Sequence, residues 1–219
     1  TGADLVVGYT TYIRLLEEQF PGLHYFSTPM RKETDRCRAA VEEALAGKTV
    51  ALVSSGDSGI YGMAGVLLEI AAEMQVDVEV TAVPGVTAAS AASAVLGAPL
   101  MHDFAVISLS DCMTPLELIW RRVSLAAEAD FVICLYNPSS KKRHDYLQKA
   151  CDLCMQHKSP DTVCGIVLNI GREGEAMKVM TLKELRDTQV DMFTTVFIGN
   201  SQTRNIDGKM VTPRGYKNV

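Results

Sequence analysis

The sequence predicts an α/β protein with a mostly parallel sheet and helices on both of its faces. Short apolar runs alternate along the chain with segments in which apolar residues recur at helical spacing, and this alternation is typical of α/β folds. The apolar runs are continuous, as expected for strands that are covered on both faces. The predicted strands cover residues 5–7, 50–53, 78–83, 104–107, 131–135, 163–168 and 196–198.

Helices are predicted in the segments between these strands. Thr181 is a candidate N-cap for one helix, and Thr114 followed by Pro115 is a typical cap and first helical residue for another. Gly47 follows the last apolar residue of a third helix and should end it. The predicted helices cover residues 11–19, 33–45, 60–74, 87–94, 115–127, 146–157 and 182–186.

A change of pattern near the middle of the chain divides it into two predicted domains. Residues 97–103 (GAPLMHD) interrupt the alternation, so an N-terminal α/β domain is expected at 1–101 and a C-terminal α/β domain at 102–219. In the second half, the apolar runs at 163–168 and 178–180 are separated by a short loop that contains glycine. This spacing indicates a β-hairpin, and therefore a mixed sheet in the C-terminal domain.

Composition and charge exclude several classes of protein. The net charge is −5, and the densest basic run is only three residues long, at 141–143, which excludes the basic footprint of a nucleic-acid-binding protein. No apolar run reaches the roughly 18 residues of a membrane-spanning helix, and the first residues lack the features of a signal peptide. A cytoplasmic protein without membrane or nucleic-acid partners is expected.

The six cysteines include one pair, Cys151 and Cys154, with the CxxC spacing of metal and redox sites. A zinc site would need a second pair of ligands at similar spacing, and the sequence has none. The pair also falls in a predicted helix. A structural role is therefore favoured over a metal site or a redox site.

The first segment that suggests chemistry is the loop at residues 56–62 (GDSGIYG), which follows a strand and precedes a helix. Ligands of α/β sheets bind beyond the carboxyl ends of the strands, and glycine allows a close approach of the backbone. The spacing fits neither a dinucleotide fingerprint nor a P-loop, and Asp57 would repel a pyrophosphate. The loop suits a cationic, hydroxyl-bearing ligand such as S-adenosylmethionine. A plain turn, with Asp57 or Ser58 as N-cap, is the alternative.

Three further segments are candidates for binding. Residues 83–94 begin with a Pro-Gly turn and continue as a helix of alanine and serine, whose small side chains suit a close neighbour, either a ligand or another helix. Thr87 could offer its hydroxyl there. Residues 135–140 and 168–175 follow strands, and turn chemistry is the simpler explanation of both. Arginine matches a carboxylate with two hydrogen bonds, which makes candidates of Arg172, Arg204 and Arg214.

Taken together, these segments resemble the tetrapyrrole (precorrin) methylases of cobalamin biosynthesis, in the family's order and over nearly the whole chain. The motifs are GDSGIYG at 56–62, PGVTA at 84–88 and LYNP at 135–138. Within the family, residues 98–104, 107–111 and 212–216 resemble the C17-methyltransferase branch. Members of that branch act on precorrin-3B in the oxygen-dependent pathway and on cobalt-factor III in the anaerobic one.

The resemblance implies the two-domain tetrapyrrole methylase fold, a homodimer, and S-adenosylmethionine held between the domains, with S-adenosylhomocysteine as product. Carried over by motif, the cofactor-binding residues are Ser55, Gly56, Asp57, Ile60, Thr87, Ala88, Asn137 and Gly171. Family members begin with a strand and a Gly-x-Gly-Pro-Gly-type loop that helps shape the substrate trough. This sequence starts after the place where they belong, so the N-terminal domain is expected to lack that first strand and loop.

The implied reaction is methylation of C17 coupled to ring contraction. Methyl transfer needs mainly positioning and exclusion of water, whereas contraction needs proton movements. His102, Ser108 and Asp111 are the candidates for acid/base or orienting roles, with interdomain hydrogen bonding as the alternative. Arg172, Arg204 and Arg214 are the candidates for binding the acidic side chains of the substrate. No motif that handles oxygen or holds a metal is visible, which favours the anaerobic role slightly.

Two other functions remain open at this point. The cofactor motifs are shared across the family, so the chain could methylate another ring carbon. A non-catalytic homologue that binds the cofactor or the tetrapyrrole is the second alternative.

Overall fold

The computed structural model describes residues 2–140 and 142–216, and it divides into two compact units, Thr1–Thr87 and Ala88–Val219. The sequence led us to expect a division between residues 101 and 102. Helix α4 (Ala88–Leu96) accounts for the difference because it packs against the strands of the second unit. Strand β4 (Gly97–Ala98) also belongs there, since it pairs with a strand near the C-terminus. Each unit is described by itself below.

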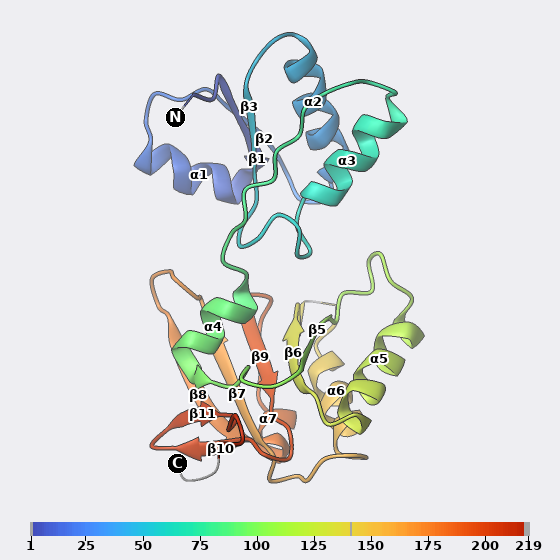
Figure 1. Cartoon of the computed structure of the whole chain (residues 1–219), viewed down its shortest axis with the longest axis vertical. Coiled ribbons are helices and arrows are strands. Elements are labelled where there is room, and N and C mark those ends of the chain that lie inside the picture. Colours follow the sequence, from blue (N-terminus) through green and yellow to red (C-terminus); the bar gives the residue numbers. More distant parts are fainter. Residues whose placement is uncertain (1, 141, 217–219) are drawn as a thin grey trace. The chain divides into compact units, whose positions relative to one another are not determined.

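The first unit is built on a parallel sheet with the strand order β2-β1-β3. These strands are β1 (Leu5–Tyr9), β2 (Tyr25–Thr28) and β3 (Val50–Val53), and both pairings are parallel. Helix α1 (Thr10–Gln19) lies to one side of the strands, with α2 (Glu33–Leu45) and α3 (Ala64–Glu73) on the other (Figure 1). The parallel α/β architecture predicted for the N-terminal part is confirmed.

One predicted strand of the first unit is absent. Residues 78–83 form no strand, although their pattern is apolar and β-branched. A cavity of about 470 Å³ is lined by Val50–Val53 on one side and by Val78–Val83 on the other. A strand requires a neighbour that accepts and donates ladder hydrogen bonds. Among the described residues, β3 pairs only with β1, so residues 78–83 have no strand partner there.

The second unit contains a mixed five-stranded sheet in the order β5-β6-β9-β7-β8. β5 is parallel to β6, β9 is antiparallel to both of its neighbours, and β7 and β8 form the predicted hairpin. A small sheet of order β10-β11-β4 accompanies it. The bounds are β5 (Phe104–Ser108), β6 (Val132–Tyr136), β7 (Val163–Leu168), β8 (Ala176–Thr181), β9 (Thr194–Ile198), β10 (Arg204–Ile206) and β11 (Lys209–Val211).

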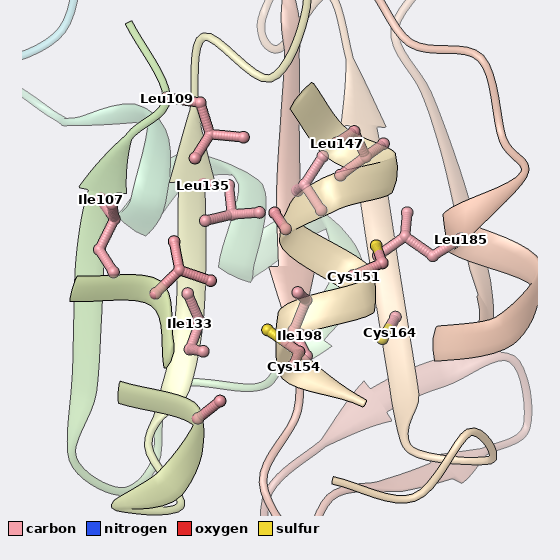
Figure 2. Packing of buried hydrophobic residues seen from close by; sticks show 14 of the residues in the cluster. Ile107, Leu109, Ile133, Leu135, Leu147, Cys151, Cys154, Cys164, Leu185 and Ile198 are labelled. Atoms are coloured by element: carbon pink, nitrogen blue, oxygen red, sulfur yellow. The ribbon is translucent and has the colours of Figure 1, made fainter. Parts of the chain in front are cut away.

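Alternate residues of the central strands serve the two faces of this sheet. In β6, Ile133 and Leu135 join a core with α5 (Leu116–Glu128), α6 (Tyr146–Cys154) and α7 (Leu182–Arg186), whereas Cys134 joins a second core beneath α4. Figure 2 shows the first of these cores, in which side chains of β5, β6, β7 and β9 meet α6 and α7. Because side chains of a strand point alternately to its two faces, one apolar run fills two layers.

Of the two N-caps predicted from the sequence, one is present and one is absent. Thr181 caps α7 as predicted, in a capping box that Glu184 completes. The predicted cap at Thr114 is wrong, because α5 begins at Leu116 and Pro115 precedes it in an extended conformation without a side-chain cap. None of the helices formed by the described residues is both long and apolar enough to span a membrane.

The CxxC pair lies inside the first core. Cys151 and Cys154 are fully buried on α6, and both are free thiols (Figure 2). Burial raises the pKa of the Cys154 thiol to about 12 and raises that of Cys151 still further above its ordinary value. Such thiols are unreactive, because the thiolate is the nucleophile and the metal ligand. The predicted structural role of the pair is therefore supported.

Candidate functional site

The loop that follows β3 is joined to the Pro-Gly turn by the side chain of Asp57. One carboxylate oxygen accepts a hydrogen bond from the backbone N–H of Gly59 at 2.8 Å. The other accepts one from the N–H of Gly85 at 2.9 Å. These bonds, first that from Gly85 and then that from Gly59, hold the pKa of the Asp57 carboxyl below its ordinary value. The loop at 56–62 and the Pro-Gly turn at 84–85 are therefore held together as one structural unit.

Glycine is required where these two segments meet. A Cβ on Gly85 would lie 2.0 Å from the carbonyl oxygen of Gly56, and Gly56 itself has a φ of 74°. A Cβ on Gly62 would lie 2.5 Å from the carbonyl oxygen of Ser58. The loop is thus closed by backbone contacts that no larger residue allows.

The N-cap that the sequence suggested at Asp57 or Ser58 is wrong. Helix α3 begins only at Ala64, and Met63 stands at its N-cap. The backbone N–H of Ala64 donates to the carbonyl oxygen of Ser58, so the segment between them forms a closed turn. Ile60 and Tyr61 lie on this turn with 42% and 60% of their surfaces exposed. Large apolar side chains at the surface of a loop suit contact with a ligand or a partner.

The predicted cofactor residues fall into two sets. Ser55, Gly56, Asp57, Ile60 and Thr87 belong to the first unit, whereas Ala88, Asn137 and Gly171 belong to the second. In the second unit, the N–H of Ala89 donates to the Tyr136 hydroxyl at 2.6 Å. The start of α4 is therefore held at the end of β6, and Ala88 and Asn137 lie next to the two bonded residues.

Ser108 and Asn137 come together at the ends of two parallel strands. The side-chain amide of Asn137 donates to Ser108 Oγ at 3.0 Å, and the N–H of Ser110 donates to the same oxygen at 3.2 Å. Asn137 has a φ of 53°, a left-handed conformation that asparagine tolerates better than most residues. Ser108 is the last residue of β5 and Asn137 follows β6, so both lie at the carboxyl ends of strands, where α/β sheets bind ligands.

Asp111 is held by two residues that the sequence did not single out. It accepts a hydrogen bond from the Tyr146 hydroxyl at 3.0 Å, and its other oxygen lies 3.7 Å from Arg143 Nη1. Burial, and then the bond to Asp111, raise the pKa of Tyr146 above its ordinary value. Arg143 is part of the basic run at 141–143, which was considered only as a possible nucleic-acid footprint. No local pattern in the sequence connects Arg143 with the distant Asp111.

The remaining predicted residues are dispersed over the second unit. His102 is exposed and makes no hydrogen bond with the residues that the structure describes. The N–H of Gly171 donates to the Glu175 carboxylate at 2.7 Å, within its own loop. Arg172 stacks over the Phe193 ring, Arg204 lies exposed on β10, and Arg214 donates to the carbonyl oxygen of Met101 at 3.3 Å. Among the described residues, no contact joins these three arginines.

No group of three or more histidine, cysteine, aspartate or glutamate side chains in residues 2–140 and 142–216 could hold a metal ion. The described loops offer backbone amides, hydroxyls, the carboxylates of Asp57 and Asp111 and exposed apolar side chains. Such loops can bind an organic molecule that carries hydroxyl and charged groups.

Similarity to known proteins covers both units. Residues 1–186 match the model of the family Tetrapyrrole (Corrin/Porphyrin) Methylases. A probable cobalt-factor III C(17)-methyltransferase of Salmonella typhimurium is 49% identical over 98% of this chain and 89% of its own length. A precorrin-3B C(17)-methyltransferase of a Sinorhizobium species is 41% identical over 95% of this chain and 85% of its own length.

Other relatives are longer than the matched region. A cobalt-factor III methyltransferase of Priestia megaterium is 42% identical over 98% of this chain, which spans only 41% of that protein. Among solved structures, the methyltransferase CobJ superposes with a TM-score of 0.88 at 35% identity, covering 96% of this chain and 89% of CobJ. These matches cover nearly all of the sequence, and the chain belongs to the tetrapyrrole (corrin/porphyrin) methylases.

Proposed function

We propose that this chain transfers a methyl group from S-adenosylmethionine to C17 of a tetrapyrrole of the cobalt-factor III or precorrin-3B type, with ring contraction, in cobalamin biosynthesis. The observation that carries the proposal is the 49% identity to a probable cobalt-factor III C(17)-methyltransferase over 98% of the chain. Relatives named for the cobalt-containing substrate and for precorrin-3B both match, so both are candidate substrates. We further propose that the enzyme is a cytoplasmic homodimer.

The loops of the first unit support S-adenosylmethionine as the cofactor. Asp57 keeps its charge because backbone amides hold its pKa low, so the loop favours a cation over a phosphate. The exposed Ile60 offers an apolar surface to an adenine or ribose ring. The related uroporphyrin-III C-methyltransferase of Thermus thermophilus was solved in complex with S-adenosylhomocysteine, although at 19% identity it shows the fold alone.

The chain's own residues would then position the reactants and move protons. The sulfonium already activates the methyl group, so transfer depends on alignment and on exclusion of water. Ser108 is oriented by Asn137, which suits it to hold or relay a proton at the substrate. Asp111 is tied to Tyr146 and Arg143, which suits it to an orienting role. His102 remains a candidate acid or base, and Arg172, Arg204 and Arg214 remain candidates for substrate carboxylates.

Incubation with S-adenosylmethionine and each tetrapyrrole tests the proposal, with product mass and absorption as readouts. The proposal predicts a mass gain of one methyl group and the absorption change of a contracted ring. The same mass gain without contraction would indicate methylation of another ring carbon. Binding of S-adenosylmethionine without any mass gain would indicate a non-catalytic homologue.

A further inference from the structure

Arg143 reaches from the segment that follows β6 to the loop that follows β5, within the second unit. Its Nη1 lies 3.7 Å from Oδ1 of Asp111, three residues after Ser108, the last residue of β5. The two segments are thus joined twice, once by Asn137 with Ser108 and once by Arg143 with Asp111. A cation therefore lies at the edge of the sheet where ligands bind.

The guanidinium of Arg143 is held through one of its three nitrogen atoms. Its Nε donates to Ser140 Oγ at 3.0 Å, and the backbone N–H of Arg143 donates to the Ser140 carbonyl oxygen at 3.0 Å. Nη1 is buried and makes no hydrogen bond with the residues that the structure describes, and Nη2 makes none with them either. A buried donor without an acceptor costs free energy. The outer edge of this guanidinium therefore suits an acceptor that arrives with a ligand.

Asp111 does not supply that acceptor. Its distance of 3.7 Å from Nη1 is too long for a hydrogen bond, although the two charges still attract each other. Its other oxygen accepts a hydrogen bond from the Tyr146 hydroxyl at 3.0 Å. Asp111 is also 38% exposed, so water weakens its attraction for the arginine.

The side chain of Arg143 is ordered before any ligand binds, yet it remains partly accessible. It is 15% exposed, whereas the candidates Arg172, Arg204 and Arg214 are exposed residues that no contact joins. A side chain that is already held loses little conformational entropy on binding. A guanidinium also matches a carboxylate with two parallel hydrogen bonds.

We propose that Arg143 binds a carboxylate side chain of the tetrapyrrole at the carboxyl ends of β5 and β6, and that Asp111 competes weakly for the same guanidinium. This inference rests on the proposed methylation of a tetrapyrrole, whose acidic side chains need cationic partners. It adds to the three arginines singled out from the sequence one that lies beside the acid/base candidates Ser108 and Asp111.

Changes at Asp111 distinguish this role from a merely structural one. If Arg143 only oriented Asp111, Arg143→Gln and Asp111→Asn would break the same contact and weaken tetrapyrrole binding alike. If Arg143 binds the substrate, Asp111→Asn removes a like charge from beside the bound carboxylate and does not weaken binding. Asparagine keeps an acceptor oxygen for the Tyr146 hydroxyl, so the surroundings of Arg143 change little.

Calorimetric titration of the whole chain with cobalt-factor III and with precorrin-3B tests the proposal. Arg143→Gln should weaken binding by about 10- to 100-fold, as expected for lost hydrogen bonds to a charged group. Arg143→Lys should weaken it less, because lysine keeps the charge and loses only the fork. Asp111→Asn should bind as tightly as the unmodified chain or up to about 10-fold more tightly. All three variants should keep the affinity of the unmodified chain for S-adenosylhomocysteine.

Arg121→Gln, an exposed change on α5, is the matched control and should alter neither affinity. Equal weakening by Arg143→Gln and Asp111→Asn would overturn the proposal, and so would a loss of S-adenosylhomocysteine binding in Arg143→Gln. Arg143→Lys provides a second variant if Arg143→Gln fails to fold, and a lysine variant that binds as weakly as one without the charge would also count against the proposal.

The same titrations separate a failure of this inference from a failure of the proposed function. If the unmodified chain binds a tetrapyrrole and Arg143→Gln binds it equally well, only the role of Arg143 is wrong. If the unmodified chain binds neither tetrapyrrole, the proposed function is wrong, and the role of Arg143 falls with it.

Discussion

The side-chain amide of Asn137 donates to the Ser108 hydroxyl at 3.0 Å, at the carboxyl ends of the parallel strands β6 and β5. The two residues entered the sequence analysis separately, Asn137 as a cofactor residue and Ser108 as a catalytic candidate. Their contact means that a change at either one alters the other. Predictions for this part of the molecule must therefore treat them as a pair.

Asn137→Gly should lower kcat by about 10-fold, the loss expected when one hydrogen bond that orients a side chain is removed. Glycine is the appropriate replacement because Asn137 has a φ of 53°, which glycine adopts without strain. Ser108→Ala should give a similar loss, and the double variant should be no worse than the greater single loss. Steady-state kinetics would measure all three. Fully additive losses would show that the two side chains act independently.

A second prediction concerns stability. The side chain of Lys158 is 3% exposed and donates to Asp130 and to the carbonyl oxygen of Phe131, both at 3.1 Å. Asp130→Asn would leave this buried cation without its counter-charge. We expect a loss of about 1–3 kcal/mol in the free energy of unfolding, less than for a fully buried pair because Asp130 is half-exposed. Asparagine tolerates the left-handed backbone of Asp130, whose φ is 58°.

Urea unfolding would measure this loss, and an exposed ion pair provides the control. Lys48 pairs with Glu43 at the surface of the first unit, and Lys48→Met should change the free energy of unfolding by less than about 1 kcal/mol. If Lys48→Met and Asp130→Asn lowered the free energy of unfolding equally, burial of Lys158 would not be the reason for the loss at Asp130.

The dependence of stability on pH follows from the same carboxylate. Burial raises the pKa of Asp130, but bonds from Ser201 and Lys158 outweigh it and leave the pKa below its ordinary value. A carboxyl whose pKa is lower in the folded protein stabilises it above the unfolded pKa, and this stabilisation is lost as the pH falls. Asp130→Asn should therefore reduce the loss of stability between about pH 5 and pH 3. Unfolding curves recorded across that range would measure the free energy of unfolding at each pH. If this free energy depended on pH equally in Asp130→Asn and in the unmodified chain, Asp130 would not be the group responsible.

Arg214 provides a test of substrate binding. Arg214→Ala should weaken tetrapyrrole binding by about 10-fold, the effect of losing one charged hydrogen bond, and should leave cofactor binding unchanged. Arg121→Ala, an exposed change on α5, is the matched control. Equal weakening of both ligands, or of neither, would remove Arg214 from the site. Separate titrations with tetrapyrrole and cofactor distinguish these outcomes.

The sequence predicted the elements that depend on local pattern and missed those that depend on partners. The apolar run of β6 was recognised because successive residues from Ile133 to Tyr136 pack alternately into two cores. The run at 78–83 has an equally strong pattern but no strand beside it in the described structure. Strand β2, of which Phe26 is 41% exposed, and strand β10 were missed, because they are short strands at sheet edges with little apolar pattern. Strand β11 was missed because it has only three residues.

In the candidate site, too, the sequence predicted the local motifs but not the contacts between distant segments. The loop at 56–62 and the turn at 84–85 were found from their glycines, but their connection through Asp57 and Gly85 was not predictable from spacing. Arg143 and Tyr146 were missed because their importance comes from Asp111, which lies far away in the sequence. Contacts between distant segments depend on the fold, and one sequence does not specify them.

The most direct test of the central claim uses S-adenosylmethionine labelled with ¹³C in its methyl group, with cobalt-factor III and precorrin-3B as separate substrates. Carbon NMR of the isolated product locates the labelled methyl group on the macrocycle. The account predicts a single labelled methyl at C17 of a ring-contracted product from at least one substrate. A label at another ring carbon, or no transfer although both ligands bind, would contradict it.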